Sequence, residues 1–303
     1  MRRRLPPVAL DQPIGRLRRG AADPTHRRTA AGWWRATRTP QGPVLLRLVG
    51  EGTHTLVEAW GAGAEWAVET AEELLGLHDD RSGFRPGRGI VGELHRRHPQ
   101  LRIGRTNAVT EALIPSIIEQ KVTGKEAFGA WARLIRRYGE PAPGPAGWAG
   151  SPASGMRLQP SPEQWTQIPS WEWRRSMVED KRSAAVVRVA RRAAALERTL
   201  DAADPDTALR SLPGVGAWTS AEVRAVAHGD PDAWSVGDYH VPREIVHALT
   251  GQVCPREAAD ARATELLQPW LGHRLRVQLL VMASGLRPER HGPRRSLPTH
   301  LPR

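Results

Sequence analysis

The pattern of apolar and polar residues divides the chain into two parts, with a change near residue 105. In the first part, apolar residues alternate with polar ones, and Pro and Gly interrupt the alternation at 40–43 and 50–52. A period of two predicts strands. The predicted elements are strands over 33–37, 44–49 and 53–60 and helices over 64–75 and 90–97. We therefore expect a small α/β domain over residues 31–90.

Beyond residue 105 the apolar residues recur at helical spacing. Asp204 or Asp206 is expected to cap one helix, and the Pro- and Gly-rich segment 140–160 predicts a long connection. The predicted helices lie within 110–138, from 162, and over 184–196, 204–211, 239–249, 257–267 and 269–283. The fold class is thus expected to be mainly α with a small α/β N-terminal domain, the helical domain covering residues 105–285.

The two ends of the chain differ from these domains. Residues 1–30 are rich in Arg, Pro and Gly and contain few large apolar residues. Such a composition predicts a disordered basic leader, an inert one being favoured over an arm that touches a polyanion. Residues 286–303 are interpreted as a basic tail.

The formal net charge of +12 favours a polyanionic partner such as nucleic acid. The basic residues are almost all Arg, with Lys only at 121, 125 and 181. This skew, with abundant Ala, Gly and Pro, also fits a GC-rich genome. Charge alone therefore leaves the two explanations about equally favoured.

Cysteine and apolar content limit the class of protein. The single Cys254 excludes an internal disulfide framework and a four-cysteine cluster. No apolar run approaches the ~20 residues of a membrane helix, and no apolar stretch follows the first residues as in a secretory signal. His95 and His98 have no further ligand residues nearby, so no metal site is expected. We expect a cytoplasmic, nucleoid-associated monomer without a membrane partner.

The segment Leu212-Pro-Gly-Val-Gly-Ala-Trp-Thr-Ser220 predicts a tight turn between two helices. Gly214 and Gly216 lack side chains, so a backbone can approach closely and φ can be positive. Amide groups at the start of the next helix suit a phosphate. Gly237-Asp238-Tyr239-His240 follows about twenty residues after the turn.

Leu-Pro-Gly-Val-Gly-x-x-Thr and the spacing to Asp238 resemble the helix-hairpin-helix DNA glycosylase superfamily, in particular its DNA-3-methyladenine glycosylase II branch. The resemblance implies that architecture, over 105–285 most strongly. It also implies contact with the DNA backbone by the hairpin residues Gly214, Val215, Gly216 and Thr219. Such contacts position DNA without reading its sequence.

The resemblance makes Asp238 the catalytic carboxylate, which stabilises an oxocarbenium-like sugar when the N-glycosidic bond breaks. An alternative is that Asp238 caps the next helix, and both roles can coexist. Trp218 stands where lyase-competent relatives carry a Lys, so base removal without strand cleavage is expected. Trp218 is also a candidate for stacking on the extruded base, with core packing as the alternative.

A second segment, Ile117-Ile-Glu-Gln-Lys-Val-Thr123, resembles the part of these proteins beside the flipped base. Gln120 is a pocket candidate, about equally well explained as a structural amide. Lys121 occupies the wedge position, where an apolar residue is usual. Tyr239 is a further pocket candidate, although core packing is favoured. The aromatic residue expected one turn beyond Trp218 is absent, because Ala221, Glu222 and Val223 fill that turn.

Together the residues predict excision of alkylated bases, of the 3-methyladenine type, from damaged double-stranded DNA by base flipping. No cofactor is expected, and a single carboxylate suffices because an alkylated purine already carries positive charge. The missing four-cysteine cluster disfavours the iron–sulfur branches of the superfamily. The alternatives are a glycosylase for another lesion and a noncatalytic protein that binds damaged DNA.

Overall fold

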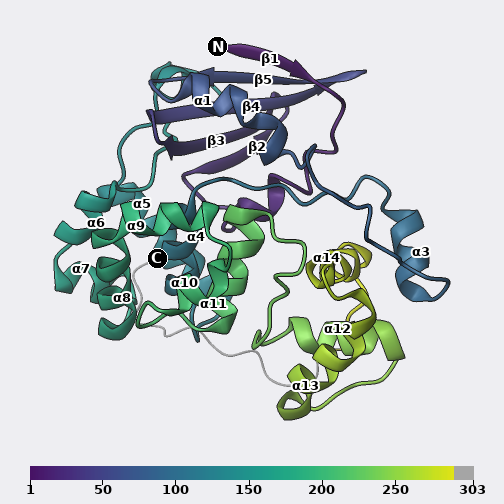
Figure 1. The fold of residues 1–303 in the computed structure, drawn as a ribbon. Coiled ribbons are helices and arrows are strands. Elements are labelled where there is room, and N and C mark those ends of the chain that lie inside the picture. Colours follow the sequence, from purple (N-terminus) through teal and green to yellow (C-terminus); the bar gives the residue numbers. More distant parts are fainter. Residues whose placement is uncertain (290–303) are drawn as a thin grey trace.

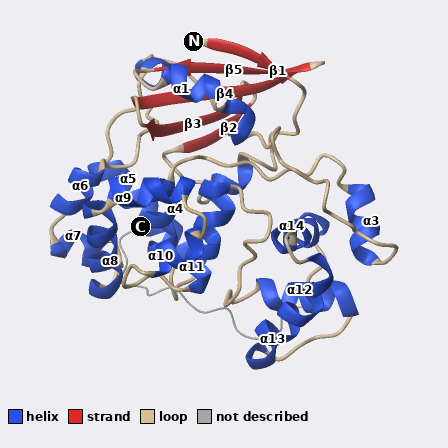
Figure 2. Ribbon diagram, viewed as in Figure 1, coloured by secondary structure: helices blue, strands red, loops and turns tan. Residues whose placement is uncertain are grey.

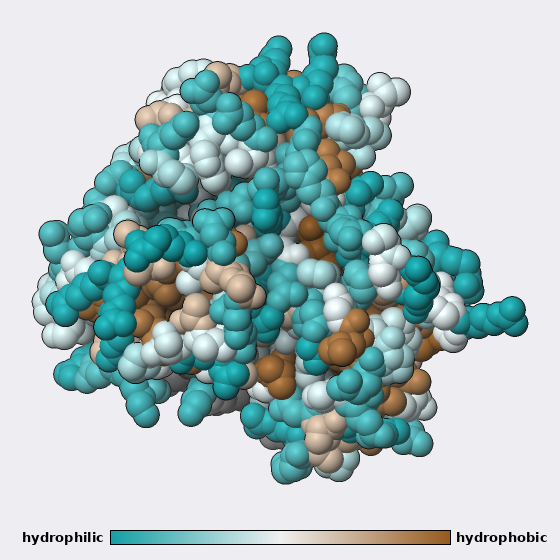
Figure 3. Space-filling view, viewed as in Figure 1, coloured by the Kyte–Doolittle hydropathy of each residue, from teal (hydrophilic) through white to brown (hydrophobic). Residues whose placement is uncertain are grey.

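The computed structural model describes residues 1–289 and shows a sheet above two groups of helices (Figure 1). The five strands are antiparallel and follow the order β1-β5-β4-β3-β2, as the red arrows of Figure 2 show. The mainly helical class with a small N-terminal sheet is therefore confirmed. The expected basic tail, 286–303, lies largely outside the described residues. Hydrophilic side chains cover most of the face in Figure 3.

The three predicted strands are confirmed, each close to its expected place. They are the centre of the sheet, and two further strands flank them. The bounds are β1 (Arg2–Leu5), β2 (His26–Thr29), β3 (Gly32–Thr39), β4 (Gly42–Glu51) and β5 (His54–Trp60). The predicted helix over 64–75 is two short helices, α1 (Ala64–Glu69) and α2 (Ala71–Leu74).

The central strands are covered on both faces. Val44, Leu46 and Leu48 are buried on the side of α1 and α2, as their alternation predicted. Leu45 and its neighbours on the opposite face pack against the segment 142–158. The long connection expected over 140–160 is thus present, and it forms the second cover of the sheet.

The prediction that residues 1–30 form a disordered leader is wrong. β1 pairs with β5 and β2 with β3. Although the segment contains few large apolar residues, Leu5, Ile14 and Leu17 are all buried in the core on the α1 and α2 side of the sheet. Arg16 donates hydrogen bonds to the carbonyl oxygens of Gly104 (3.0 Å) and Ala225 (2.7 Å). The amino-acid composition of a segment does not reveal which of its arginines bind backbone carbonyls in distant parts of the chain.

The helices below the sheet form two groups, each with its own core. The first group contains α4 (Val109–Ile118), α5 (Gly124–Tyr138), α6 (Pro162–Gln167), α7 (Ser170–Arg175), α8 (Asp180–Arg191), α9 (Ala193–Glu197), α10 (Pro205–Arg210) and α11 (Ala217–Val223). The second contains α3 (Ile90–Arg97), α12 (Val241–Thr250), α13 (Arg256–Leu267) and α14 (Arg274–Ser284). A π-helix over Arg224–His228 continues α11 toward the second group.

Local capping explains several helix starts. The Thr123 side chain accepts from Glu126 N, and the Glu126 side chain accepts in return from Thr123 N, which forms a capping box for α5. Asp204, one of the two residues that the sequence offered, accepts from Thr207 N at 3.0 Å and caps α10. A buried ion pair of Arg276 in α14 with Asp79, at 2.7 Å, ties the second helical group to the chain leaving α2.

The contacts of Arg16 predict a measurable loss of stability. Replacing Arg16 by Met would leave two carbonyl oxygens without their donor, at a cost of about 1–3 kcal/mol. Arg28→Met is the matched control, because Arg28 pairs with Asp11 at the surface, where such pairs contribute about 0–1 kcal/mol. Urea unfolding followed by circular dichroism measures both. Equal midpoints for the two variants would contradict a structural role for the N-terminal segment.

Candidate active site

The predicted hairpin connects α10 to α11. Gly214 has φ +100°, and a Cβ on it would lie 2.9 Å from the Cβ of Ala185, so glycine is required there for two reasons. Gly216 adopts an ordinary extended conformation at the start of α11, with open space where its Cβ would be. Leu212 and Val215 are buried and hold the turn in place, while both glycines stay exposed.

Gln120 joins the end of α4 to this hairpin. Its Nε2 donates to Gly214 O at 2.9 Å and to Thr219 Oγ1 at 2.8 Å. The structural role that the sequence left open for Gln120 is therefore present, and its place in a base pocket stays a prediction. Thr219 and Val215 are buried, so contact of these two residues with DNA stays a prediction.

Lys121 follows immediately, in the turn between α4 and α5. It is exposed and has φ +59°, a left-handed conformation that is uncommon for a residue with a side chain. Gln120 on one side and the Thr123 cap of α5 on the other fix the turn around it. Its insertion into a duplex stays a prediction.

Asp238 lies in the loop between the π-helix and α12, beside Trp218. Its Oδ2 accepts a hydrogen bond from Trp218 Nε1 at 3.2 Å. Its Oδ1 accepts from His240 N at 2.7 Å and from Val241 N at 2.9 Å. The N-cap residue of α12 is His240, so Asp238 is not the N-cap, but its carboxylate binds the amides at the entry to the helix. These bonds hold the carboxylate in one orientation beside the indole.

Tyr239, the next residue after Asp238, lies at the surface. Its ring is 52% exposed and lies 4.3 Å from the guanidinium carbon of Arg256, at the start of α13. The core packing favoured from the sequence is therefore wrong for this residue. A pocket role for Tyr239 stays a prediction.

Glu222 is the residue that the sequence reading missed. It lies one helical turn beyond Trp218 on α11, and its Oε1 accepts from Ser235 Oγ at 2.6 Å. The pKa of Glu222 is raised to about 7, chiefly by burial and also by the nearby charges of Glu119 and Asp238, while the Ser235 hydrogen bond and Arg19 act to lower it. The spacing of four residues from Trp218 could have pointed to it, but the sequence reading used that turn only to note a missing aromatic.

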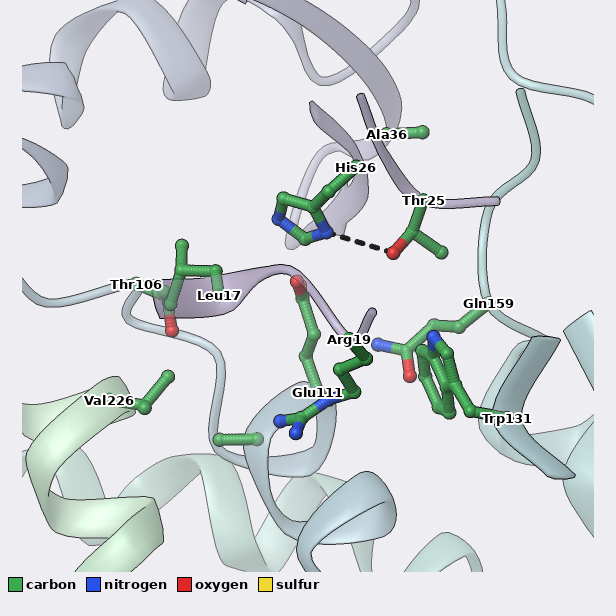
Figure 4. A pocket seen from close by; sticks show the side chains of 11 residues that line it. Leu17, Arg19, Thr25, His26, Ala36, Thr106, Glu111, Trp131, Gln159 and Val226 are labelled. Atoms are coloured by element: carbon green, nitrogen blue, oxygen red, sulfur yellow. Dashed lines mark hydrogen bonds between the residues drawn. The ribbon is translucent and has the colours of Figure 1, made fainter. Parts of the chain in front are cut away.

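Two hollows in the molecule lie away from Asp238. Figure 4 shows a cavity of about 20 Å³ between the sheet and the helices, where His26 Nδ1 lies 2.9 Å from Thr25 Oγ1. This space is enough for about one water, so it is no base pocket. A wider depression of about 500 Å³ lies against the sheet, between Trp34, Trp60 and Trp148.

Within residues 1–289, no group of three or more His, Cys, Asp or Glu side chains could hold a metal ion. No helix in the same part of the chain is long and apolar enough to cross a membrane.

The comparisons with solved structures identify the fold. A 3-methyladenine DNA glycosylase from Archaeoglobus fulgidus superposes with a TM-score of 0.73 at 19% identity, covering 94% of this chain and 98% of that one. An 8-oxoguanine glycosylase/lyase from Clostridium acetobutylicum, in complex with double-stranded DNA, gives a TM-score of 0.64 at 12% identity and covers 92% of both chains. No family model and no curated protein matches the sequence.

The chain therefore has the fold of the helix-hairpin-helix DNA glycosylases, and the architecture that the hairpin motif predicted is confirmed. The similarity extends over nearly the whole chain, the N-terminal sheet included.

The two hydrogen bonds of Gln120 predict a local effect on the hairpin. In Gln120→Ala, Gly214 O and Thr219 Oγ1 lose their donor, so amide hydrogen exchange over residues 212–220 should become faster. Gln164→Ala is the control, because Gln164 caps α6 in the first helical group. Mass spectrometry of peptic fragments follows both variants. Unchanged hairpin exchange in Gln120→Ala would show that the link is dispensable.

Proposed function

We propose that the protein is a monofunctional DNA glycosylase that hydrolyses the N-glycosidic bond of alkylated bases, of the 3-methyladenine type, in damaged double-stranded DNA. The observation that supports this best is the hydrogen bond of Trp218, in the first turn of α11, to Asp238. It sets a fixed carboxylate beside an aromatic surface, the two groups that an extruded alkylated nucleotide requires.

The carboxylate acts on the sugar. As the bond between C1′ and the base breaks, positive charge develops on the deoxyribose, and Asp238 stabilises it electrostatically. Three N–H groups, from Trp218, His240 and Val241, point at this carboxylate and keep its orientation. A group already oriented needs little reorganisation when the charge appears. Asp238 also aligns the water that attacks C1′.

The hairpin and the opposite loop hold the duplex. The exposed main chain at Gly214 and Gly216 lies at the start of α11, where amide groups favour a phosphate. Lys121 stands at the tip of the turn that Gln120 ties to the hairpin. Its chain can occupy the gap left by the extruded base, with the charged end directed at phosphate. The net charge of +12 adds the general attraction to DNA.

Trp218 also argues for hydrolysis without strand cleavage. An indole cannot form a Schiff base with the sugar, and it occupies the helix position where lyases of this fold carry an amine. An abasic site is therefore the expected product, and strands should break only after alkali. Trapping with borohydride, which would link any amine such as Lys121 to the sugar, checks this point directly.

The test is base release from methylated duplex DNA by the wild type and by Asp238→Asn. Asparagine retains an oxygen that can accept from His240 N and Val241 N but carries no charge, so release of 3-methyladenine should fall by about 10²–10³-fold. Asp260→Asn is the matched control: Asp260 accepts from Gly237 N at 2.8 Å and supports the same loop. Its rate should stay near that of the wild type.

Two outcomes would contradict the proposal. Release of 8-oxoguanine but not of 3-methyladenine would identify a glycosylase for another lesion. Tight binding of damaged duplex without release of any base, unchanged in Asp238→Asn, would identify a noncatalytic damage-binding protein.

A further inference from the structure

We propose that Glu222, one turn beyond Trp218 and beside the Asp238 loop, donates a proton to the extruded base when that base is an uncharged purine. The inference rests on the proposed function and adds a second catalytic residue to it. An uncharged purine is a poor leaving group until a ring nitrogen is protonated, whereas an alkylated purine leaves as a cation. A proton donor at the base therefore extends the range of substrates.

The position of Glu222 supports this role. Residues four apart on a helix share a face, so Glu222 lies one turn along α11 on the side of Trp218. Trp218 is itself bonded to Asp238. Glu222 is only partly buried, and its Oε1 contacts Ser235, three residues before Asp238. The carboxyl therefore lies beside the Asp238 loop with part of the residue open to solvent.

The hydrogen bonds around Ser235 determine which oxygen of Glu222 carries the proton. Ser235 N donates to Gln278 Oε1 at 2.7 Å, which fixes the orientation of the Gln278 amide. Gln278 Nε2 then donates to Ser235 Oγ at 2.8 Å, so the hydroxyl proton of Ser235 is directed to Glu222 Oε1 at 2.6 Å. Oε1 is thus an acceptor, and the acidic proton belongs on Oε2. Within the described residues, Oε2 has no hydrogen-bond partner, so it can donate to a base.

The surrounding charges keep the proton on Glu222 near neutral pH. Glu119 at the end of α4 and Asp238 across the loop disfavour a further negative charge. Arg19 and Arg16 from the N-terminal segment favour it, but Arg19 is paired with Glu119 and Arg16 with two carbonyls. Burial outweighs the arginines and raises the pKa of Glu222 to about 7, which suits a general acid.

Glu222 transfers its proton from Oε2 to a ring nitrogen of the purine while the C1′–N bond breaks and its electron pair passes to the base. Water adds its oxygen to C1′ and gives its proton to Asp238. The base leaves neutral and the sugar becomes an abasic site. Exchange with solvent returns the proton to Glu222 and removes the one on Asp238.

The test measures single-turnover release of hypoxanthine, an uncharged purine, and of 7-methylguanine, a cationic one, by the full-length protein. In Glu222→Gln, Oε1 can still accept from Ser235, but no acidic proton remains. The ratio of hypoxanthine to 7-methylguanine release should fall about 10²-fold, within the range of general acid catalysis. In the wild type, hypoxanthine release should fall about tenfold per pH unit above pH 7, and in Glu222→Gln this dependence should be absent.

Ser235→Ala is the control for a structural role. It removes the hydrogen bond to Glu222 and leaves the acid in place. If Glu222 only anchors the Asp238 loop, Ser235→Ala should lower both rates alike, whereas Glu222→Gln, which keeps the bond from Ser235, should leave the ratio of the two rates unchanged. That result would overturn the inference. So would release of 7-methylguanine without release of hypoxanthine at any pH, although the proposed function would then stand. Release of neither base by the wild type would overturn the inference, and the proposed function would fall as well only if 3-methyladenine were also retained. Release of hypoxanthine that depends on pH, without release of 7-methylguanine or 3-methyladenine, would support Glu222 and contradict the alkylated substrate.

A measurement without DNA checks the proton itself. Because its pKa rises on folding, Glu222 holds a proton in the folded state between about pH 4.5 and pH 7 that the unfolded chain has released. The free energy of unfolding should therefore decrease as pH rises through this window, relative to Glu222→Gln. Parallel pH profiles for the two proteins would contradict a proton on Glu222 at neutral pH.

Discussion

The arrangement of the candidate site depends on how the Asp238 loop is held against α11. Two side-chain hydrogen bonds, one helical turn apart, make this contact: Trp218 to Asp238, and Ser235 to Glu222. The loop is bonded to the second helical group, because Asp238 accepts from Val241 N of α12 and Ser235 accepts from Gln278 of α14. In contrast, α11 packs in the core of the first group. The two helical groups thus meet at the side chains that we propose to take part in the reaction. The two bonds together hold the Asp238 loop beside α11.

The N-terminal part of the chain makes direct contacts with the helices around the candidate site. Arg16 reaches the carbonyl of Ala225, just beyond α11, and Arg19 pairs with Glu119 beside Gln120. Both guanidinium groups contribute to the charge felt by Glu222. A boundary drawn from composition near residues 90–105 would divide the chain in sequence, but these contacts cross it. The sheet segment therefore sets part of the electrostatic environment of the helical part.

Local features of the sequence predicted much of this structure. Alternating apolar residues gave the three central strands, Asp204 the start of α10, and the hairpin motif the fold and the place of Asp238. The failures concern contacts between distant residues. The order of residues 1–30 depends on bonds such as that of Arg16 to Ala225, which no local composition reports. Likewise, Glu222 is an ordinary helix residue in sequence, and its raised pKa follows only from burial and from the charges that folding brings around it.

The hydrogen bonds of Gln120 fix the hairpin relative to the turn that carries Lys121. Gly214 O accepts a hydrogen bond from the Gln120 side chain, and Lys121 is the next residue after Gln120 in the chain. The distance between the hairpin and the Lys121 turn is consequently fixed by the protein itself. In the proposed complex the two loops would therefore contact the duplex at one separation whatever its base sequence, as suits contacts that position DNA without reading it.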